Sequence, residues 1–479
     1  MKRKTIVFSV MGIFLLATSC YAQMVLKSTA DDQQTVEVTV YNKNLGLVKD
    51  IRRINLPQGQ GELRFMDVAS HIMPVTVHIE SLSFPEGLMV LEQNYEYDLM
   101  DQNKLLDKYV GKKVKIINWN LYENKKEKEE VEATLLSNNN GQIYKIDNEI
   151  YLGHPGYKVL PQIPENLIAN PTLTWLYQNT SNQPHDVKVS YLTDNITWKA
   201  DYILALDKDD ALAALTGWVT LDNQSGATYK DAKLKLVAGE VNRVMEHRQL
   251  RKSPRVDVMY EMDAGAPQFV EESFFEYHIY DLKRKTTIKD KQTKQVSLLE
   301  AMGVKIKKEL VAKGQGNFYF SNYGGRRDLK TPVNVYIKFK NEEENKLGMP
   351  LPAGIMRLYK EDSQGSLQFI GEDRIDHTPK DEEVKLKIGE AFDVVVERVQ
   401  MSYQRPNKSV YETEWEVTIR NHKKEDVVVV LLEPMRGDWR LKSSTHKYKK
   451  IDAFTARFDI SVPQDGEVKV NYKVAVRTR

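Results

Sequence analysis

The densest group of side chains that could bind a metal ion lies between residues 372 and 383. Carboxylate oxygens are the ligands that Ca²⁺ prefers. The spacing lacks the glycine at the sixth position of an EF-hand loop, and Arg374 and Lys380 dilute the local charge. Two interpretations stay open, a solvated acidic turn or a calcium site formed by Asp373, Asp376, His377 and Asp381. The segment contains Glu372, Asp373, Asp376, His377, Asp381, Glu382 and Glu383.

The other residues of catalytic type show no recognisable arrangement. Nine histidines occur, and no two of them are three, four or five residues apart, so a helical zinc pair is absent. The Gly-x-Ser-x-Gly elbow and a glycine-rich phosphate loop are also missing, and Gly314-Gln-Gly316 is interpreted as a turn. Paired carboxylates for glycoside hydrolysis cannot be identified, because the fold sets their separation. The absence of these motifs favours a non-enzymatic protein. Calcium is the one cofactor that the sequence suggests.

The elements that must position these side chains are mostly β-strands. Val36, Val38 and Val40 alternate with polar residues, and the segment from Val75 to Ile79 does the same. A period of two places one strand face on a core and the other in water, which is typical of antiparallel sandwiches. We therefore predict a mainly β fold of antiparallel β-sandwich domains, an immunoglobulin-like C-terminal unit, a small inserted β-barrel-like unit and few short helices.

Changes in this pattern divide the chain. We predict an N-terminal β domain over residues 35–98, a helix-plus-β insert over 99–165, a central sandwich over 166–384 and an immunoglobulin-like sandwich over 385–479. The last domain has clean alternation, for example at Trp415, Val417 and Ile419.

The insert is expected to begin with a helix from Met100 to Tyr109, in which Leu105, Leu106 and Tyr109 share one face and which Gly111 ends. Short strands that form a small barrel or a meander should follow it. The charged run from Lys125 to Glu130 is interpreted as a solvated loop, and a helix continuing from this run into Val131–Leu136 is the alternative. The predicted strands are Lys113–Asn118, Val131–Ser137 and Ile143–Ile146.

Residues 243–268 interrupt the central domain with proline, glycine and basic residues. We expect a long, mobile surface loop there, which a protease cuts first. The alternative is a basic arm that docks on phosphate or an anionic polymer. The basic residues are Arg248, Arg251, Lys252 and Arg255.

The start of the chain predicts export. Lys2, Arg3 and Lys4 precede the uncharged run from Ile6 to Ala17, which is too short for a membrane helix, so residues 1–22 form a predicted signal peptide. Cleavage after Ala22 is one expectation, and a lipobox-like reading that leaves Cys20 as a lipidated first residue is the other. Because Cys20 is the single cysteine, the folded part contains no disulfide or thiolate metal site.

The composition excludes several classes of protein. The 479 residues include 69 Lys and Arg against 67 Asp and Glu, and 41% are hydrophobic. This is too apolar for a disordered chain and too charged for a polytopic membrane protein. The balanced charge gives no general reason to bind nucleic acid. No later stretch is long enough for a transmembrane helix, so a membrane tether is expected only if Cys20 is lipidated.

Several strings after residue 190 stand out from the strand pattern: Thr193–Tyr202, Leu221–Gly226, Lys233–Gly239, Pro350–Gly354, Gly371–Asp373, His377–Pro379 and Gly389–Asp393. They resemble the bacterial domain of unknown function 4139 family, some members of which are labelled mucoidy inhibitors. Upstream, Tyr41–Leu45 and Glu92–Asp98 are similar to the region that accompanies this domain. The resemblance covers nearly the whole chain after the signal peptide, and it implies an exported β-sandwich protein without established catalytic residues.

These strings also have physical interpretations. Trp198 and Tyr202 are four residues apart in a predicted strand, so they share one face and should anchor the core. The two prolines of Pro350–Gly354 remove ladder donors, which predicts an edge or crossover segment. The favoured function is an exported cell-envelope protein, periplasmic or associated with the outer membrane. It would be a non-enzymatic binding or structural module whose partner is an envelope protein or a glycan. The alternative is an envelope hydrolase that uses carboxylates from distant loops.

Overall fold

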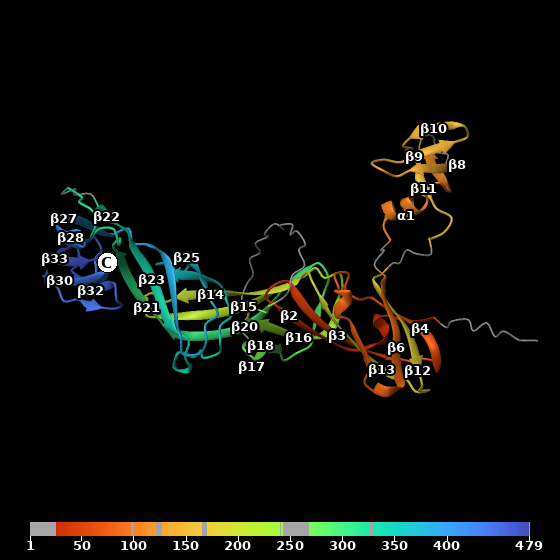
Figure 1. Ribbon diagram of the computed structural model, residues 1–479, viewed down its shortest axis with the longest axis horizontal. Helices are drawn as coiled ribbons and strands as arrows, with labels where there is room; N and C mark the ends of the chain where they lie inside the picture. The colour runs from red at the N-terminus through yellow and green to blue at the C-terminus, as the bar shows by residue number, and fades with distance from the viewer. Residues whose placement is uncertain are drawn as a thin grey trace, which may run out of the picture. The chain divides into compact units, whose positions relative to one another are not determined.

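Figure 1 shows a chain built almost entirely of β-strands. The computed structural model describes residues 25–96, 100–120, 127–164, 170–239, 241–242, 268–324 and 329–478. Several antiparallel sheets occur in these ranges, which confirms the mainly β fold. The predicted signal peptide, with Cys20, and residues 243–267 of the predicted loop lie outside them. The chain divides into unit 1, Met1–Val36 with Val48–Leu192, and unit 2, Glu37–Leu47 with Thr193–Arg479.

Unit 1 contains a four-stranded sheet in the order β1-β4-β12-β6 and a second set of strands in the order β3-β13-β5. Alternate side chains of these strands are buried, as the periodicity of the sequence predicts; among them are Phe65, Trp175 and Val187. The strands are β1 (Val25–Ser28), β3 (Leu45–Ile54), β4 (Gly59–Met66), β5 (His78–Ser81), β6 (Leu88–Glu96), β12 (Thr172–Asn179) and β13 (His185–Thr193), with the 3-10 turns η1 (Ala30–Asp32) and η3 (Pro85–Gly87).

The predicted strand from Val75 to Ile79 is wrong in its first half. Pro74–Thr76 forms the 3-10 turn η2, and β5 begins only at His78. Pro74 stands at the start of this turn, where its ring fixes φ, and Thr76 Oγ1 donates a hydrogen bond to the Met73 carbonyl at 2.7 Å. Val75 is consequently exposed and does not contribute to the core.

The insert of unit 1 consists of the helix α1 (Gln102–Lys108) and a five-stranded antiparallel sheet in the order β10-β9-β8-β7-β11. Asp101 caps the helix, because its Oδ1 accepts a hydrogen bond from Lys104 N at 2.9 Å. Leu106 and Tyr109 face the core of the insert, as predicted. The sheet ends at β10 and β11 and is open across the described residues, so the insert is a meander. The strands are β7 (Lys113–Asn120), β8 (Glu127–Ser137), β9 (Ile143–Ile146), β10 (Glu149–Leu152) and β11 (Tyr157–Val159).

The charged run predicted as a loop is part strand. Residues 121–126 lie outside the described ranges, but Glu127–Glu130 belongs to β8. Cross-strand ion pairs explain why acidic residues are accommodated here. Lys115 on β7 lies 3.7 Å from Glu130, and Lys113 lies 2.8 Å from Glu132.

Two sheets of unit 2 pack face to face around Trp198. One has the order β17-β18-β16-β2, with β19 paired to β16, and the other has the order β20-β15-β14-β24-β25. Trp198 on β14 contacts the ring of Tyr280 on β18, with centroids 6.2 Å apart. The strands are β2 (Gln33–Tyr41), β14 (Ile196–Leu206), β15 (Leu212–Asn223), β16 (Tyr229–Ala238), β17 (Phe269–Phe274), β18 (Tyr277–Leu282), β19 (Thr286–Ile288), β20 (Gln292–Lys305), β24 (Gly354–Glu361) and β25 (Leu367–Ile375).

The C-terminal sandwich of unit 2 has one sheet in the order β26-β23-β21-β29-β32-β31 and one in the order β22-β27-β28-β33-β30. Its core includes Trp415, Val417 and Ile419, as the alternation predicts, and also Leu310 and Phe318 from earlier in the chain. None of the described helices is long and apolar enough to cross a membrane. The elements are β21 (Lys307–Lys313), β22 (Leu329–Thr331), β23 (Val333–Lys340), η4 (Glu343–Asn345), β26 (Glu383–Glu390), β27 (Val394–Asn407), β28 (Val410–Asn421), β29 (Val427–Pro434), β30 (Asp438–Ser444), β31 (Lys449–Lys450), β32 (Thr455–Val462) and β33 (Glu467–Arg477).

Candidate functional site

The four residues of the predicted calcium site make separate local contacts. The Asp373 carboxylate accepts hydrogen bonds from Arg374 N at 2.8 Å and Lys387 N at 2.6 Å. His377 Nδ1 accepts one from Ala353 N at 3.2 Å. The Asp376 carbonyl accepts one from Thr378, and Asp381 N donates to the Asn341 carbonyl. Within the described ranges, no three His, Cys, Asp or Glu residues come together as metal ligands do, so the calcium site stays a prediction.

Two of the strings singled out in the sequence, Thr193–Tyr202 and His377–Pro379, contact the crossover segment Pro350–Gly354. Two buried tyrosines hold it, because Tyr202 Oη donates to the Pro352 carbonyl at 2.8 Å and Tyr280 Oη to the Pro350 carbonyl at 2.9 Å. Leu351 forms an antiparallel bridge with Thr378. A Cβ on Gly354 would clash with the Ala200 carbonyl, because β14 and β24 pair closely there. These contacts hold the crossover against β14, β18 and Thr378 and assign it a role in the fold of unit 2.

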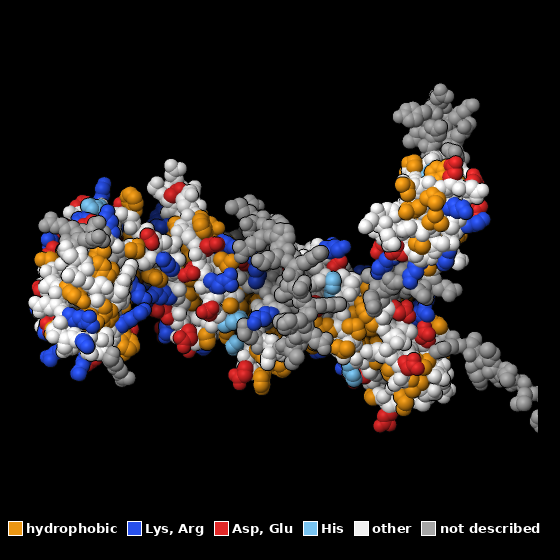
Figure 2. Space-filling view, turned by 45° about the horizontal axis from the view of Figure 1, so that its top comes forward, with side chains coloured by type: hydrophobic (Ala, Val, Ile, Leu, Met, Phe, Trp, Pro, Cys, Tyr) orange, Lys and Arg blue, Asp and Glu red, His pale blue; other side chains and the backbone are white. Residues whose placement is uncertain are grey.

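A surface that the sequence analysis missed lies on the outer face of the C-terminal sandwich. Lys307 on β21 is opposite Lys338 on β23, and Lys338 is opposite Lys385 on β26. Lys387 lies two residues along β26 on the same face. The sequence neighbours of these lysines point to the opposite face of the sheet: Ile337 on β23 and Leu386 on β26 are buried. We call Lys307, Lys338, Lys385 and Lys387 the lysine face; blue side chains gather in this part of unit 2 in Figure 2.

Glu309 on β21 compensates part of this charge. Its carboxylate is nearly buried and lies 3.1 Å from Lys338 Nζ, 3.4 Å from Lys307 Nζ and 3.7 Å from Arg457 Nη2. Burial alone would raise the pKa of Glu309, but the hydrogen bond and charge of Lys338, with the charge of Arg457, outweigh burial and lower it. Glu309 is therefore ionised, and its carboxylate forms ion pairs with Lys307 and Lys338.

Lys385 packs against an aromatic side chain of the lysine face. Its Nζ lies 4.3 Å from the centroid of the Tyr336 ring, as in a cation–π contact. Partial burial and the positive charge of Lys338 lower the pKa of Lys385 below its ordinary value, and Lys313 adds to this effect against the opposing charges of Glu309 and Glu383. A bound anion next to Lys385 would relieve this positive field.

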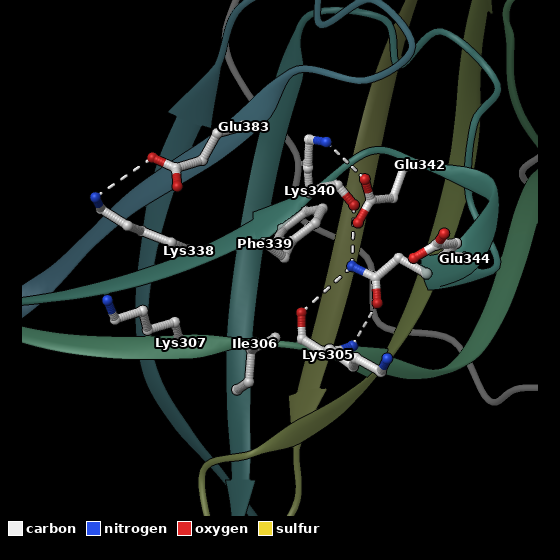
Figure 3. A pocket seen from close by; sticks show the side chains of 10 residues that line it. Lys305, Ile306, Lys307, Lys338, Phe339, Lys340, Glu342, Glu344 and Glu383 are labelled. Atoms are coloured by element: carbon white, nitrogen blue, oxygen red, sulfur yellow. Dashed lines mark hydrogen bonds and ion pairs between the residues drawn. The ribbon is translucent and has the colours of Figure 1, made fainter.

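A shallow pocket of about 250 Å³ adjoins the lysine face and shares Lys307 and Lys338 with it (Figure 3). In Figure 3 the two side chains reach from neighbouring strands toward the same side. Asn345 braces the far end, because its Oδ1 accepts from Lys305 N at 2.6 Å and its Nδ2 donates to the Lys340 carbonyl at 2.9 Å. The lining is charged with both signs: Lys305, Ile306, Lys307, Lys338, Phe339, Lys340, Glu342, Glu344, Asn345 and Glu383.

Unit 1 contains a Ser-His-Asn arrangement that the sequence spacing did not reveal. His185 Nδ1 lies 2.9 Å from Ser81 Oγ, and its Nε2 lies 3.1 Å from Asn179 Oδ1. The Asn179 amide donates to the Leu56 and Ser181 carbonyls, so Oδ1 is the acceptor and His185 carries its proton on Nε2. These three residue types also occur in hydrolase triads, where the serine oxygen is bonded to the histidine Nε2 and not, as here, to Nδ1. Ser81 and His185 are, however, buried, so we assign the arrangement to the packing of β5 against β13.

This histidine should make unit 1 sensitive to acid. Burial lowers the pKa of His185 below its ordinary value of 6.5, so the unfolded chain binds the proton more tightly than the folded protein. The free energy of unfolding is then highest above pH 6.5 and falls as the pH drops below that value. We expect His185→Gln to remove this part of the pH dependence, measured by urea unfolding between pH 5 and 8. His78→Gln, at an exposed histidine, is the matched control, and identical pH slopes for both variants would contradict the assignment.

One comparison with known proteins gives a match for this chain. The model of the family described as "Domain of unknown function (DUF4139)" matches residues 187–478, which is more than half of the chain. A search of curated proteins gives no significant match. The matched region contains the strings that hold the Pro350–Gly354 crossover, and it contains the lysine face. The chain belongs to the DUF4139 family.

Proposed function

We propose that this protein is an exported, non-enzymatic binding module of the cell envelope, and that the lysine face binds an acidic glycan. The observation that carries the proposal is the row of Lys307, Lys338 and Lys385 on three adjacent strands. Neighbouring strands are about 4.8 Å apart, so the row presents closely spaced cations on a rigid sheet. A polymer with regularly spaced carboxylates matches such a row.

The alignment of lysines on adjacent strands should lower the stability of the sheet when no ligand is bound. Like charges directly opposite each other on neighbouring strands destabilise a sheet. Glu309 and Glu383 pair with Lys338 and reduce the repulsion, but no ion pair with Lys385 or Lys387 occurs among the described residues. A ligand that supplies negative charge would offset the remaining repulsion. This favours a binding role for the lysine face over a purely structural one.

A binding role also fits the state of the carboxyl groups better than hydrolysis does. A general acid needs a raised pKa. Where the described part of the chain has a carboxyl with a shifted pKa, the shift is downward, as for Asp210, whose partners Lys308 and Lys360 outweigh the effect of burial, and for Glu309. The pocket is shallow and has both signs of charge, which suits a polar ligand that remains partly solvated.

Placement in the cell envelope is the second part of the proposal. It rests on the basic and apolar start of the chain, Lys2 to Ala17. Fractionation of cells should find the protein outside the cytoplasm, in the periplasm or with the outer membrane. Recovery of the uncleaved chain from the cytoplasm would contradict export.

Neutralising the lysine face should weaken glycan binding. We expect Lys307→Gln, Lys385→Gln and Lys387→Gln together to reduce affinity for polygalacturonate about tenfold, from roughly 0.2–1 kcal/mol for each exposed ion pair. Lys338 is left intact so that Glu309 keeps its partner. Calorimetric titration at low ionic strength measures the effect, and binding to the wild type should weaken as salt is added.

A control variant that loses the same number of positive charges elsewhere distinguishes binding by the lysine face from an effect of the overall charge. Lys230→Gln, Lys289→Gln and Lys424→Gln remove three exposed lysines elsewhere in unit 2. This control should bind polygalacturonate as the wild type does, and neutral dextran should bind to neither protein. Equal loss of affinity in both triple variants, or no binding by the wild type, would refute the proposal.

A further inference from the structure

The strand β10 at one edge of the insert has two unusually exposed apolar side chains. β10 ends the five-stranded sheet, where Figure 1 shows it beside β9. Ile150 is 66% exposed and Leu152 is 85% exposed. Proteins normally protect a sheet edge with lysine, proline or a bulge. The sequence of β10, Glu149-Ile-Tyr-Leu152, has none of these, whereas the opposite edge at β11 is followed by Pro161 and Pro164.

The backbone of the same two residues faces the open edge. Gly153 N donates to the Gln142 carbonyl at 2.7 Å, which makes this a hydrogen-bonded pair of β10 with β9. Hydrogen-bonded pairs alternate along an antiparallel ladder. Tyr151 is therefore hydrogen-bonded to Tyr144, and Ile150 and Leu152 occupy the non-hydrogen-bonded positions. Their N–H and C=O groups point away from β9.

These outward groups are self-complementary about a two-fold axis through Tyr151. If a second β10 lies antiparallel with Tyr151 opposite its own copy, Ile150 of each chain is opposite Leu152 of the other. Both of these pairs then form hydrogen bonds with the free N–H and C=O groups, four bonds in all. We propose that the insert pairs with a second copy of this chain through β10, which makes one continuous sheet across two copies.

Side-chain chemistry favours this register. Ile150 and Leu152 lie on one face of the sheet, so the two copies bring four apolar side chains together there. The Tyr151 rings of the two copies meet on the other face. Glu149 faces Gly153 of the other copy, so no like charges are directly opposed. A two-fold pairing of identical surfaces is also the commonest symmetry of homo-oligomers.

The first test is the oligomeric state of the full-length protein. Sedimentation velocity over a concentration series should show a dimer in equilibrium with monomer. Ile150→Lys with Leu152→Lys places charges on the pairing edge and should weaken dimerisation at least tenfold. Tyr157→Lys with Val159→Lys makes the same change on the opposite edge at β11 and should leave dimerisation unchanged.

Cross-linking tests the register. Residues of a non-hydrogen-bonded pair have Cα atoms about 4.5 Å apart, within the usual range for a disulfide. In a Cys20→Ser background, Tyr151→Cys should form a covalent dimer on oxidation, and Glu149→Cys should not. A wild type that is monomeric at all concentrations, or a dimer indifferent to the β10 lysines, overturns the proposal. Capture of an extended peptide by a monomeric protein would assign the edge to a different partner and also overturn it. None of these outcomes depends on the lysine face.

Discussion

Replacing Arg398 by methionine is expected to lower the free energy of unfolding of the C-terminal sandwich by about 3–5 kcal/mol. Arg398 and Glu433 are both fully buried, and Arg398 Nη1 lies 2.5 Å from Glu433 Oε1. Removing one partner leaves the other charge without compensation inside the core. Urea unfolding followed by tryptophan fluorescence measures the loss, because Trp415 lies in the same core.

The network around this pair explains why the loss should be large. Tyr319 Oη donates to Glu433 Oε2 at 2.5 Å and lies 3.1 Å from Tyr472 Oη. Burial, with the Glu433 carboxylate nearby, raises the pKa of both tyrosines well above the ordinary value, so both remain protonated donors. The network also excludes a side chain at Gly314, where a Cβ would lie 2.5 Å from Glu433 Oε2.

A second variant separates the ion pair from general packing. Arg398→Met with Glu433→Leu removes both charges and should recover part of the stability, because an apolar pair can replace a buried ion pair at little cost. The coupling energy from the double-mutant cycle should then be well above zero. If the double variant is as unstable as the sum of the two single changes, the loss reflects packing volume and not the charge.

The sequence contained an overlooked signal for this network. Arg398 follows Val394 and Val396 in the inward phase of β27, and Glu433 follows Val429 and Leu431 in the inward phase of β29. A charged residue in phase with buried ones must find a buried partner. Periodicity could therefore have identified each residue. It could not pair them, since pairing depends on which sheets face each other.

The same limit applies to the lysine face. Alternation along each strand predicts that Lys307, Lys338 and Lys385 point outward, but it does not show that they lie side by side. Their alignment arises from the register of β21, β23 and β26, which joins segments far apart in the chain. β21 pairs in parallel with β29, and β14 with β24, although each pair is far apart in the chain. The order of strands in these sheets could therefore not be predicted from local sequence patterns.

Local chemistry was the more reliable guide. The apolar spacing of Leu105, Leu106 and Tyr109 predicts a helix from Met100 to Tyr109, and α1 occupies Gln102–Lys108 of this range, after its cap at Asp101. The predicted strand Ile143–Ile146 has the bounds of β9. Alternation failed at Val75, where a preceding proline sets the backbone, and the acidic residues of β8 were mistaken for a loop because their lysine partners lie on another strand.

Trp198→Ala is expected to destabilise unit 2 by about 3–5 kcal/mol, as other truncations of buried aromatic residues do. The side chain is 2% exposed and touches the ring of Tyr280 across the two sheets. Its Nε1 donates to the Val237 carbonyl at 3.3 Å, so the substitution also removes a buried hydrogen bond. Thermal unfolding of the variant should show a melting temperature several degrees lower.

The control is an exposed aromatic residue that also belongs to one of the strings that resemble the family. Phe392 is 95% exposed in the loop between β26 and β27, and Phe392→Ala should leave the melting temperature within error of the wild type. The pair of variants tests what the strings of this family encode. If Trp198→Ala melts normally and Phe392→Ala does not, the burial described for unit 2 is wrong, and Trp198 becomes a candidate ligand contact.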